Sequence, residues 1–474
     1  MRGFLASSIG VTCAAALALP LTPPAVATAA TVPRPAPNAE VFVPGSTQSL
    51  PLAPLAADRA LGSTAEQGLP ARDVHRFSMV GVVWDNPDTE LHGRVQVRAR
   101  AATTGAWSGW QDVETHYAED GADPDAAERA SGRVRGATAP LWVGDSDGVE
   151  VRVRADAESS GESHGESRAA GAAALPSGLR LELVDPGEAG EPEESGEPGA
   201  DPGGPVTARH APVDGPRADA LSAESAASAA SAANAGLAPL GALEIPALDR
   251  ARTERELLVL RAGELTEQQK VKPFIGPRPR IVTRRGWGAN EKLREKKFVY
   301  TKKVKAAFVH HTATGNGYRC SQVPSVIRGI YRYHVSSMGW RDIGYNFLVD
   351  KCGKIYEGRA GGVAKPVLGA HTLGFNTNSM GIAVLGTFGA SRPSSAAVKA
   401  VARLTAWKLG LFGVNPRGKT YLKSGGGNLY RKGKKVRLNV ISGHRDGFST
   451  ACPGWQLYRK LGSARSSAAR YQGR

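Results

Sequence analysis

Two histidines and one cysteine in the C-terminal part of the chain have the side chains of a metal site. His310 lies at the end of an apolar run typical of a strand, His444 follows another such run, and Cys452 comes eight residues after His444. Two imidazoles and one thiolate are sufficient to hold Zn²⁺ while the fourth tetrahedral position is left to water. An open site of this kind lowers the pKa of the water toward about 7 and polarises a carbonyl group.

Each of these residues also has an ordinary structural interpretation. A histidine at a strand end is often a surface residue, and a lone cysteine often packs as a small apolar side chain. His310 and His311 are adjacent, so they point to opposite faces of a strand and only one can join a given site. Spacing alone therefore leaves both interpretations open.

The elements that must position these residues alternate between strands and helices. Ile327, Ile330, Tyr331 and His334 follow helical spacing, with Pro324 near the first turn. Strands are expected at 304–309, 345–349, 381–385 and 436–442, and helices at 321–337 and 394–411. The alternation predicts an α/β domain over residues 276–474, with a mixed central sheet flanked by helices.

The N-terminal half has a different pattern. Apolar residues alternate with polar ones around 95–99, 149–153 and 179–183, and 79–84 is an apolar run. Several short strands separated by turn-forming residues predict an all-β, sandwich-like domain over residues 71–186. We find no catalytic set of residues in it. A wall- or sugar-binding module and a spacer are both compatible with the pattern.

The remaining segments are expected to be a signal and linkers. Residues 1–30 have a positive start, an uncharged apolar run and small-residue cleavage sites, which is typical of a signal peptide. A membrane anchor is the alternative, although the run is marginal for spanning a bilayer. Residues 31–70 are rich in Pro and Ala, and 187–275 is of low complexity, so both are expected to be linkers, with one possible helix at 250–270.

The charge is distributed unevenly along the 474 residues. The whole chain has a net charge of +16, but residues 270–474 contain 39 Lys+Arg and only 6 Asp+Glu. A segment this basic is attracted to a polyanion. For an exported bacterial protein the nearest polyanions are cell-wall polymers, and nucleic acid is the other candidate.

The cysteine count limits the covalent arrangement. If Cys13 is removed with the signal peptide, three cysteines remain in an oxidising compartment. An odd number favours one disulfide and one thiol with a different role.

Seven segments of the C-terminal block resemble the peptidoglycan recognition protein family and the related phage-lysozyme-type amidases. They occur in the family's order over about 180 residues. The matching segments are 285–289, 308–313, 342–347, 355–359, 369–372, 376–381, and 443–446 together with 452–454. On this basis the chain is identified as a secreted bacterial member of the family.

The resemblance implies a site and a reaction. It assigns zinc binding to His310, His444 and Cys452, and a catalytic role to Tyr345, whose phenol can donate to an oxyanion or help to move a proton. The implied activity is that of an N-acetylmuramoyl-L-alanine amidase. The alternative within the family is a non-catalytic peptidoglycan-binding module, but members without activity typically lose the cysteine ligand.

Further positions follow from the same resemblance. His334, His371 and Asn376 match residues that line the family's glycopeptide groove. Phage members have a catalytic Lys at the position of Thr450. The absence of Lys here agrees with the animal-type members, and the Thr450 hydroxyl is a second candidate catalytic group. Ala383 occupies a position where some related amidases have Glu, so a carboxylate base is not expected there.

The remaining cysteines, Cys320 and Cys352, are expected to form the disulfide. A second metal site is the competing interpretation, but no additional His lies near either cysteine in the sequence. The protein is expected to be secreted and associated with the wall, to bind peptidoglycan and anionic wall polymers, and to have no stable membrane anchor. A nucleic-acid partner is not expected, because the chain has an export signal and lacks mixed aromatic and basic binding motifs.

Overall fold

The computed structural model describes residues 44–55, 66–115, 117, 119–156, 174–188 and 216–474. The predicted signal peptide, and most of the first predicted linker, lie outside these ranges. Within them, no helix has both the length and the apolar character needed to cross a membrane.

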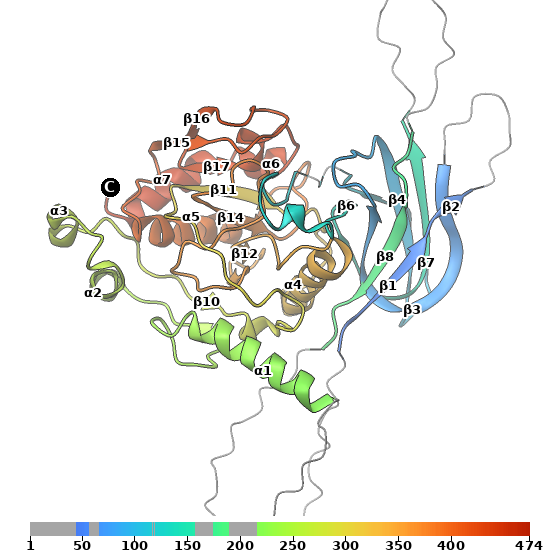
Figure 1. The fold of residues 1–474 in the computed structure, drawn as a ribbon, viewed down its shortest axis with the longest axis horizontal. Coiled ribbons are helices and arrows are strands. Elements are labelled where there is room, and N and C mark those ends of the chain that lie inside the picture. Colours follow the sequence, from blue (N-terminus) through green and yellow to red (C-terminus); the bar gives the residue numbers. More distant parts are fainter. Residues whose placement is uncertain (1–43, 56–65, 116, 118, 157–173, 189–215) are drawn as a thin grey trace, which may run out of the picture. The chain divides into compact units, whose positions relative to one another are not determined.

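An antiparallel sheet forms the N-terminal domain (Figure 1). Its strand order is β1-β8-β3-β7-β4-β5, and β2 and β6 also pair with β3. The strands are β1 (Ser46–Pro51), β2 (Ala53–Pro54), β3 (Glu66–Trp84), β4 (Gly93–Ala101), β5 (Gln111–Val113), β6 (Gly136–Ala137), β7 (Leu141–Ala155) and β8 (Arg180–Asp185). Alternate residues such as Val95, Val97, Val149 and Val151 are buried in its core. The prediction of an all-β domain is confirmed.

The domain begins earlier than its sequence pattern indicates. β1 lies inside the segment expected to be a linker, and it pairs with β8 from Ser46↔Asp185 to Pro51↔Arg180. Pro51 fits at the end of this strand because β1 is at the edge of the sheet, where one side of the backbone needs no partner.

The C-terminal domain contains a mixed sheet of order β17-β11-β14-β12-β13-β10-β9. Its strands are β9 (Glu244–Ile245), β10 (Ile281–Val282), β11 (Ala306–His311), β12 (Phe347–Val349), β13 (Ile355–Glu357), β14 (Ser379–Val384) and β17 (Ile441–Gly443). β11, β12, β14 and β17 are mutually parallel, while β12 and β13 are antiparallel. A separate hairpin consists of β15 (Lys419–Lys423) and β16 (Lys435–Asn439).

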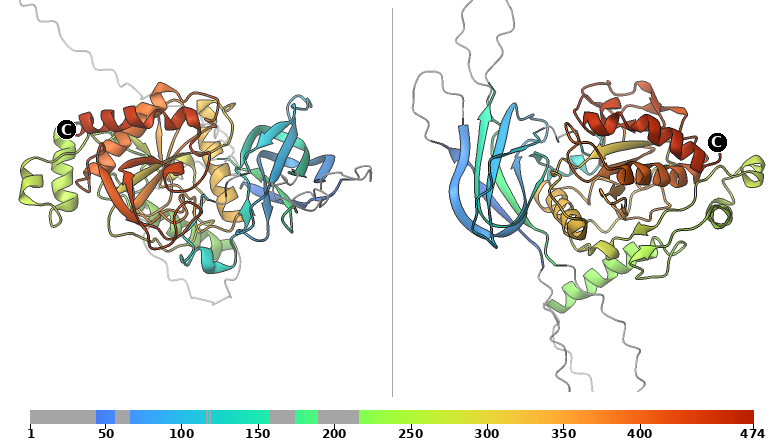
Figure 2. Two further views of the ribbon diagram at one scale, coloured as in Figure 1. Left: turned by 90° about the horizontal axis from the view of Figure 1, so that it is seen from above. Right: turned by 180° about the vertical axis from the view of Figure 1, so that it is seen from behind.

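Helices cover both faces of this sheet, as Figures 1 and 2 show. Val309, Phe347 and Ile382 share one apolar cluster with α5 (Ser395–Gly410) and α7 (Leu461–Tyr471). Leu348 and Ala383 face the other way, toward α4 (Val323–Arg332). The short helices are η1 (Arg129–Ser131), η2 (Arg285–Trp287), η3 (Cys320–Gln322), the π-helix η4 (Tyr333–Ser337), η5 (His444–Asp446) and α6 (Trp455–Tyr458). The predicted α/β arrangement is confirmed.

Residues 216–275, expected to belong to a linker, instead form α1 (Pro216–Ala232), β9, α2 (Arg250–Arg261) and α3 (Glu267–Val271). The Ala-rich helix α1 has buried residues at Ala226 and Ala230. Just after it, Asn234 donates to the Glu357 carboxylate and accepts a hydrogen bond from the Val363 backbone N–H. Small side chains and a polar anchor let this low-complexity segment pack against the C-terminal domain, although it has too little apolar surface to fold alone.

One part of the N-terminal domain packs closely against the C-terminal domain. We call Tyr117 and residues 119–128 the inserted segment; they lie between β5 and η1. Tyr117 belongs to an apolar cluster that includes Met79 and Val83 from β3 as well as Tyr333 and Tyr345. The two domains therefore share a core next to the residues singled out by the sequence.

Candidate metal centre

Parallel strands bring the two predicted histidine ligands to one edge of the sheet. His310 lies near the carboxyl end of β11, and His444 directly follows β17. The two strands pair in parallel, with Val309 opposite Gly443. The carboxyl ends of neighbouring parallel strands lie together, which is where open α/β sheets bind ligands. Cys452 lies in the loop between η5 and α6, where its backbone N–H donates to Thr450 Oγ1 at 3.1 Å.

The three side chains converge. One ligand atom from each of His310, His444 and Cys452 lies within 4.8 Å of the others, and His310 Nδ1 is 3.7 Å from Cys452 Sγ. All three residues are buried. Neither ring nitrogen of His444 makes a hydrogen bond to any described residue. Because buried polar atoms are normally paired, these donors fit a cation.

The protonation states agree with that interpretation. Burial lowers the pKa of His310 to about 4, so its imidazole is neutral near pH 7 and available as a ligand. Burial also raises the pKa of the Cys452 thiol well above its usual value. A metal ion in the site would supply the positive charge that a buried thiolate needs.

His311 faces away from this centre. Its Nδ1 accepts a hydrogen bond of 3.2 Å from the Phe388 backbone N–H, and Phe388 belongs to the apolar cluster on the α5 side of the sheet. The alternation along β11 therefore selects His310 alone.

A fourth group, the carboxylate of Asp120, reaches the same centre, and sequence analysis missed it. Asp120 Oδ1 is 3.0 Å from His444 Nδ1 and 3.2 Å from His310 Nδ1, and the residue is only 3% exposed. Asp120 Oδ1 makes no hydrogen bond to a described residue despite these short distances. In the sequence Asp120 lies in an acidic, Ala-rich stretch of the other domain, which predicts only a surface turn.

Tyr345 is tied to the same carboxylate. Its hydroxyl donates to Asp120 Oδ2 at 2.8 Å and lies 3.0 Å from the Tyr117 hydroxyl. Tyr117 in turn is 2.7 Å from His334 Nε2, and His334 Nδ1 accepts a hydrogen bond from the Gly344 backbone N–H. Because Nδ1 accepts, Nε2 carries the proton, and a single donor direction runs from His334 through Tyr117 and Tyr345 to Asp120.

The other predicted groove residues also contact the centre or the inserted segment. His371 Nδ1 is 3.0 Å from Thr372 Oγ1, which is 3.4 Å from His310 Nε2, so these two residues orient the imidazole. Asn376 Nδ2 donates to Gly121 O at 2.7 Å. Thr450 is partly buried, and its hydroxyl contacts the loop that carries Cys452.

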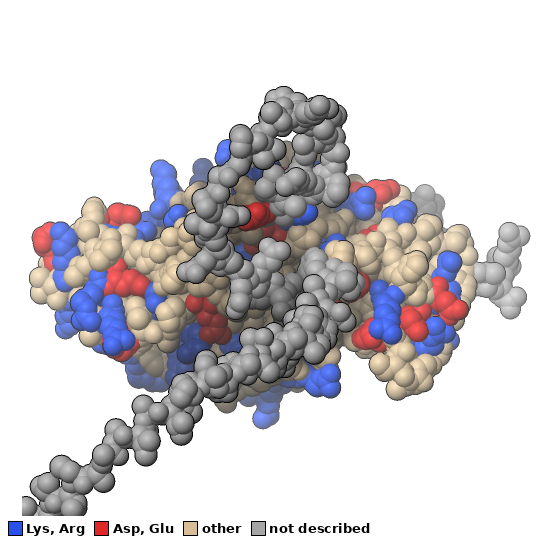
Figure 3. Space-filling model, turned by 90° about the horizontal axis from the view of Figure 1, so that it is seen from below, with Lys and Arg blue, Asp and Glu red and all other residues tan. Residues whose placement is uncertain are grey.

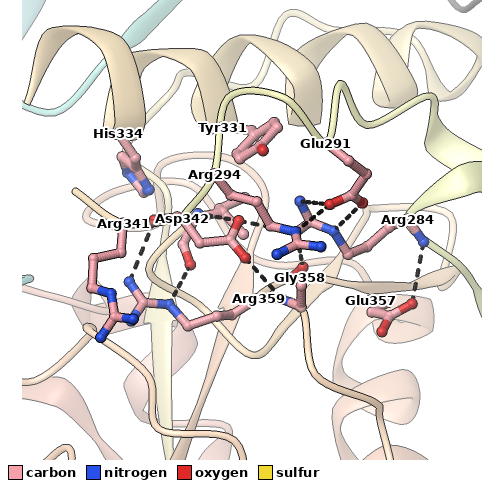
Figure 4. Close-up of polar contacts among 12 residues, drawn as sticks. Arg284, Glu291, Arg294, Tyr331, His334, Arg341, Asp342, Glu357, Gly358 and Arg359 are labelled. Atoms are coloured by element: carbon pink, nitrogen blue, oxygen red, sulfur yellow. Dashed lines mark hydrogen bonds and ion pairs between the residues drawn. The ribbon is translucent and has the colours of Figure 1, made fainter. Parts of the chain in front are cut away.

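A buried ion network holds the turn before Tyr345. Arg284 Nε lies 2.6 Å from Glu291, and Arg284 Nη1 lies 3.0 Å from Asp342. Figure 4 shows these side chains pointing toward one another below the helix that carries Tyr331 and His334. Asp342 also accepts hydrogen bonds from the backbone N–H groups of Ile343 and Ala360. The network fixes the backbone two residues before Gly344.

The predicted disulfide is present: Cys320 and Cys352 are bonded to each other, and Cys452 is a free, buried cysteine. The bridge joins the start of the α4 region to the turn after β12. It therefore lies on elements that flank Tyr345 without contributing to the donor set.

The mixed sheet carries two His at the ends of neighbouring parallel strands, and one Cys lies in the loop that follows the second of them. A family model described as N-acetylmuramoyl-L-alanine amidase matches residues 300–455. A second model, described as Rv3811 N-terminal galactose-binding domain-like, matches residues 35–174.

Two sequence relatives agree with this family match. Peptidoglycan-recognition protein SC2 of Drosophila simulans is 30% identical over 184 residues, which is 38% of this chain and 84% of the relative. Peptidoglycan-recognition protein 1 of Holotrichia diomphalia is 34% identical over 187 residues, or 39% of this chain and 79% of the relative. A solved structure of wild-type Drosophila PGRP-LB matches 39% of this chain and 92% of its own, with 26% identity and a TM-score of 0.31. On its sequence relatives, the chain belongs to the peptidoglycan recognition protein and N-acetylmuramoyl-L-alanine amidase family.

Proposed function

We propose that the C-terminal domain hydrolyses the amide bond between N-acetylmuramic acid and L-alanine in bacterial peptidoglycan, with Zn²⁺ held by His310, His444 and Cys452. The observation that supports this most strongly is the convergence of three buried donor atoms at the carboxyl ends of β11 and β17. When bound, Zn²⁺ would supply the Lewis acid that polarises the scissile carbonyl and activates water.

The side chains around the centre are proposed to orient the metal ligands and to stabilise charge that develops during the reaction. Thr372 and His371 orient His310 through its Nε2 atom. Tyr345 presents a buried hydroxyl beside the donor set, where it can donate to the oxygen that becomes negative as the amide is attacked. Ala383 pairs with His310 across the sheet and brings no carboxylate, so Tyr345 carries more of the proton and charge stabilisation.

Thr450 has a smaller part in the proposal. Its hydroxyl accepts from the Cys452 backbone N–H and so shapes the ligand loop. The Thr450 side chain also contacts the carboxylate of Glu119 in the inserted segment. We assign Thr450 to positioning the Cys452 loop rather than to contact with the reacting atoms.

Substrate binding is proposed for the surface around His334 and Asn376. These two side chains come from η4 and from the loop before β14, and both are buried where they contact the inserted segment. His371 is fully buried against Ser379 and Thr372, so its proposed role shifts from lining the groove to orienting His310.

Secretion and wall association remain part of the proposal. The basic C-terminal block supports attraction to anionic wall polymers. On the face in Figure 3, Lys and Arg side chains are spread among neutral surface and in several places lie beside Asp or Glu. The alternative of a non-catalytic peptidoglycan-binding module is less favoured, because the third donor, Cys452, is retained and lies with the other two.

Mass spectrometry of purified peptidoglycan sacculi incubated with the full chain tests the proposal. The expected products are stem peptides with a free N-terminal alanine and glycan strands without peptide. The proposal is tested by which bond is cleaved, independently of the rate of cleavage. Cleavage only within the glycan or within the stem peptide would contradict the proposal.

A further inference from the structure

The inserted segment lies along the surface where the substrate is proposed to bind. The Leu373 backbone N–H donates to Glu119 O at 2.9 Å, and Asn376 Nδ2 donates to Gly121 O and to Asp123 Oδ1. Tyr117 stacks against Trp340 with an interplanar angle of 3°. These contacts join the segment to residues that precede and follow Tyr345 in the chain, and Asp120 between them contacts the centre.

The two oxygens of the Asp120 carboxylate contact two different groups. These are the metal-site histidines and the Tyr345 hydroxyl, the same groups that the scissile carbonyl of a substrate is proposed to contact. Its Oδ1 faces the two imidazole Nδ1 atoms, and its Oδ2 accepts a hydrogen bond from the Tyr345 hydroxyl. One oxygen therefore points to the metal position and the other to the proposed oxyanion donor. This is the arrangement expected of an internal carboxylate that mimics the substrate.

The distances fit a closed metal site. With Zn–N and Zn–O bonds near 2.0–2.1 Å and Zn–S near 2.3 Å, tetrahedral ligands lie about 3.3 Å apart for N and O, and about 3.6 Å apart for N and S. Asp120 Oδ1 lies 3.0 and 3.2 Å from the two histidines, and His310 Nδ1 lies 3.7 Å from Cys452 Sγ. Asp120 Oδ1 also lacks a hydrogen bond to any described residue, as a metal ligand would.

We propose that Asp120 is the fourth ligand of the metal, and that the inserted segment keeps the enzyme in a latent state by filling both the open position and the substrate groove. The proposal rests on the function proposed above, since it concerns the same metal centre. The metal site of this chain would then differ from an open catalytic site, in which three protein ligands leave one position for water or substrate.

A second buried contact anchors the segment. Glu128 forms a bidentate pair with Arg359, at 2.8 and 2.9 Å, and also accepts from the Arg341 backbone N–H at 3.0 Å. Arg359 in turn donates to Ile343 O, beside Tyr345. A buried bidentate pair gives strong and specific attachment, so Glu128 holds the segment in the position from which Asp120 reaches the metal site.

Access of a small anion to the metal tests the proposal without measuring catalysis. The full chain is loaded with Co²⁺, and its visible absorption is followed during titration with millimolar azide. The wild-type spectrum is expected to stay unchanged, because no position is open. Asp120→Ala is expected to show a saturating spectral change, and Asp120→Asn, which keeps the volume and loses the charge, is expected to do the same.

Asp125→Ala is the matched control. Asp125 lies in the same segment, is exposed, and pairs with Lys432 at the surface. This variant is expected to behave like wild type. Equal azide responses in wild type and Asp120→Ala would overturn the proposal, since the fourth position would then be open in both. Absence of a response in both Asp120 variants would also overturn it, since another group would then close the site.

A second measurement separates latency from the function itself. Turnover of a soluble muropeptide by Asp120→Ala is expected to exceed that of wild type by at least about tenfold, which corresponds to about 1.4 kcal/mol of lost competition. If both Asp120 variants admit azide but no protein releases N-terminal alanine, the amidase function fails while Asp120 remains the fourth ligand. If the azide response is equal in all proteins and alanine is released, the function stands and the latency is wrong.

Discussion

Two buried polar clusters lie near Tyr345, and they differ in how their charges are matched. In the cluster around Arg284, the guanidinium contacts Glu291 and Asp342, and Asp342 also accepts two backbone hydrogen bonds. In the cluster around His310, both ring nitrogens of His444 and one oxygen of Asp120 lack hydrogen bonds to described residues. Both clusters are buried.

The difference indicates different roles. A buried charge costs free energy unless it is paired, so a fully matched cluster stabilises one arrangement of the backbone. A buried cluster in which two imidazoles and a carboxylate lie together, with several polar atoms left without a hydrogen bond, is suited to hold a cation. The Arg284 network therefore fixes the turn that presents Tyr345, whereas we propose that the His310 cluster holds a metal ion.

Breaking the matched cluster is expected to have the largest effect on stability. Arg284→Met would leave Glu291 and Asp342 without their shared partner, and removal of one member of a buried pair typically costs about 3–5 kcal/mol. Urea unfolding followed by circular dichroism measures the loss. Arg280→Met is the control, because Arg280 makes an exposed pair with Glu244 that is expected to contribute within about 1 kcal/mol. Equal losses in the two variants would show that the network is not structural.

Two tyrosines sharpen the comparison, one beside each cluster. Tyr345→Phe is expected to lower turnover on the order of 100- to 1000-fold, the usual effect of losing one oxyanion donor. Tyr331→Phe is the matched control; the Tyr331 hydroxyl donates to Asn290 O beside the Arg284 network, and its loss is expected to leave turnover nearly unchanged. Release of N-terminal alanine measures both.

This pair is compared in a chain that also carries Asp120→Ala, because the native Asp120 accepts the Tyr345 hydrogen bond. Zinc content and circular dichroism confirm that each variant is loaded and folded. If Tyr345→Phe kept more than half of the parent turnover, Tyr345 would be a packing residue and the two tyrosines would be equivalent.

A smaller effect is expected at Glu357, at the edge of the matched cluster. Burial raises the pKa of Glu357 to about 7 from a usual value of 4.5, even though Asn234 and the Arg284 backbone N–H donate to its carboxylate. The folded chain therefore keeps a proton that the unfolded chain loses, so this stabilisation is complete below about pH 4.5 and is lost as the pH rises through about 7.

Urea midpoints at pH 5 and pH 7.5 measure this dependence. Glu357→Gln is expected to lose less stability than wild type between the two pH values, since its amide does not titrate. Glu267→Gln, at an exposed position of α3, is the control and is expected to keep the wild-type difference. Identical pH dependence in wild type and Glu357→Gln would contradict the assignment.

The predicted parts of the site are those with local sequence patterns. His310 and His444 each follow an apolar strand, and parallel pairing of β11 with β17 brings their ends together. Cys452 lies in a short loop a few residues later. Strand periodicity and family resemblance therefore sufficed to predict that these three residues lie together beside Tyr345, and the resemblance predicted the disulfide.

The residues that sequence analysis missed are joined by contacts between distant segments. Asp120 meets His310 and His444 across the domain boundary, and its own neighbourhood has the composition of a solvated turn. α1 was missed for a related reason. Its Ala and Ser residues have too little apolar surface to indicate a packed helix, and burial at Ala226 depends on a partner surface elsewhere in the chain.

Metal content measured by elemental analysis tests the central contrast between the two clusters most directly. The account predicts close to one zinc per wild-type chain and strong depletion in Cys452→Ser and His310→Asn. His311→Asn is the matched control, because its side-chain oxygen can still accept the hydrogen bond from Phe388 N and the residue faces away from the centre. It should retain zinc. Full zinc retention in Cys452→Ser, or equal loss in the two histidine variants, would contradict the account.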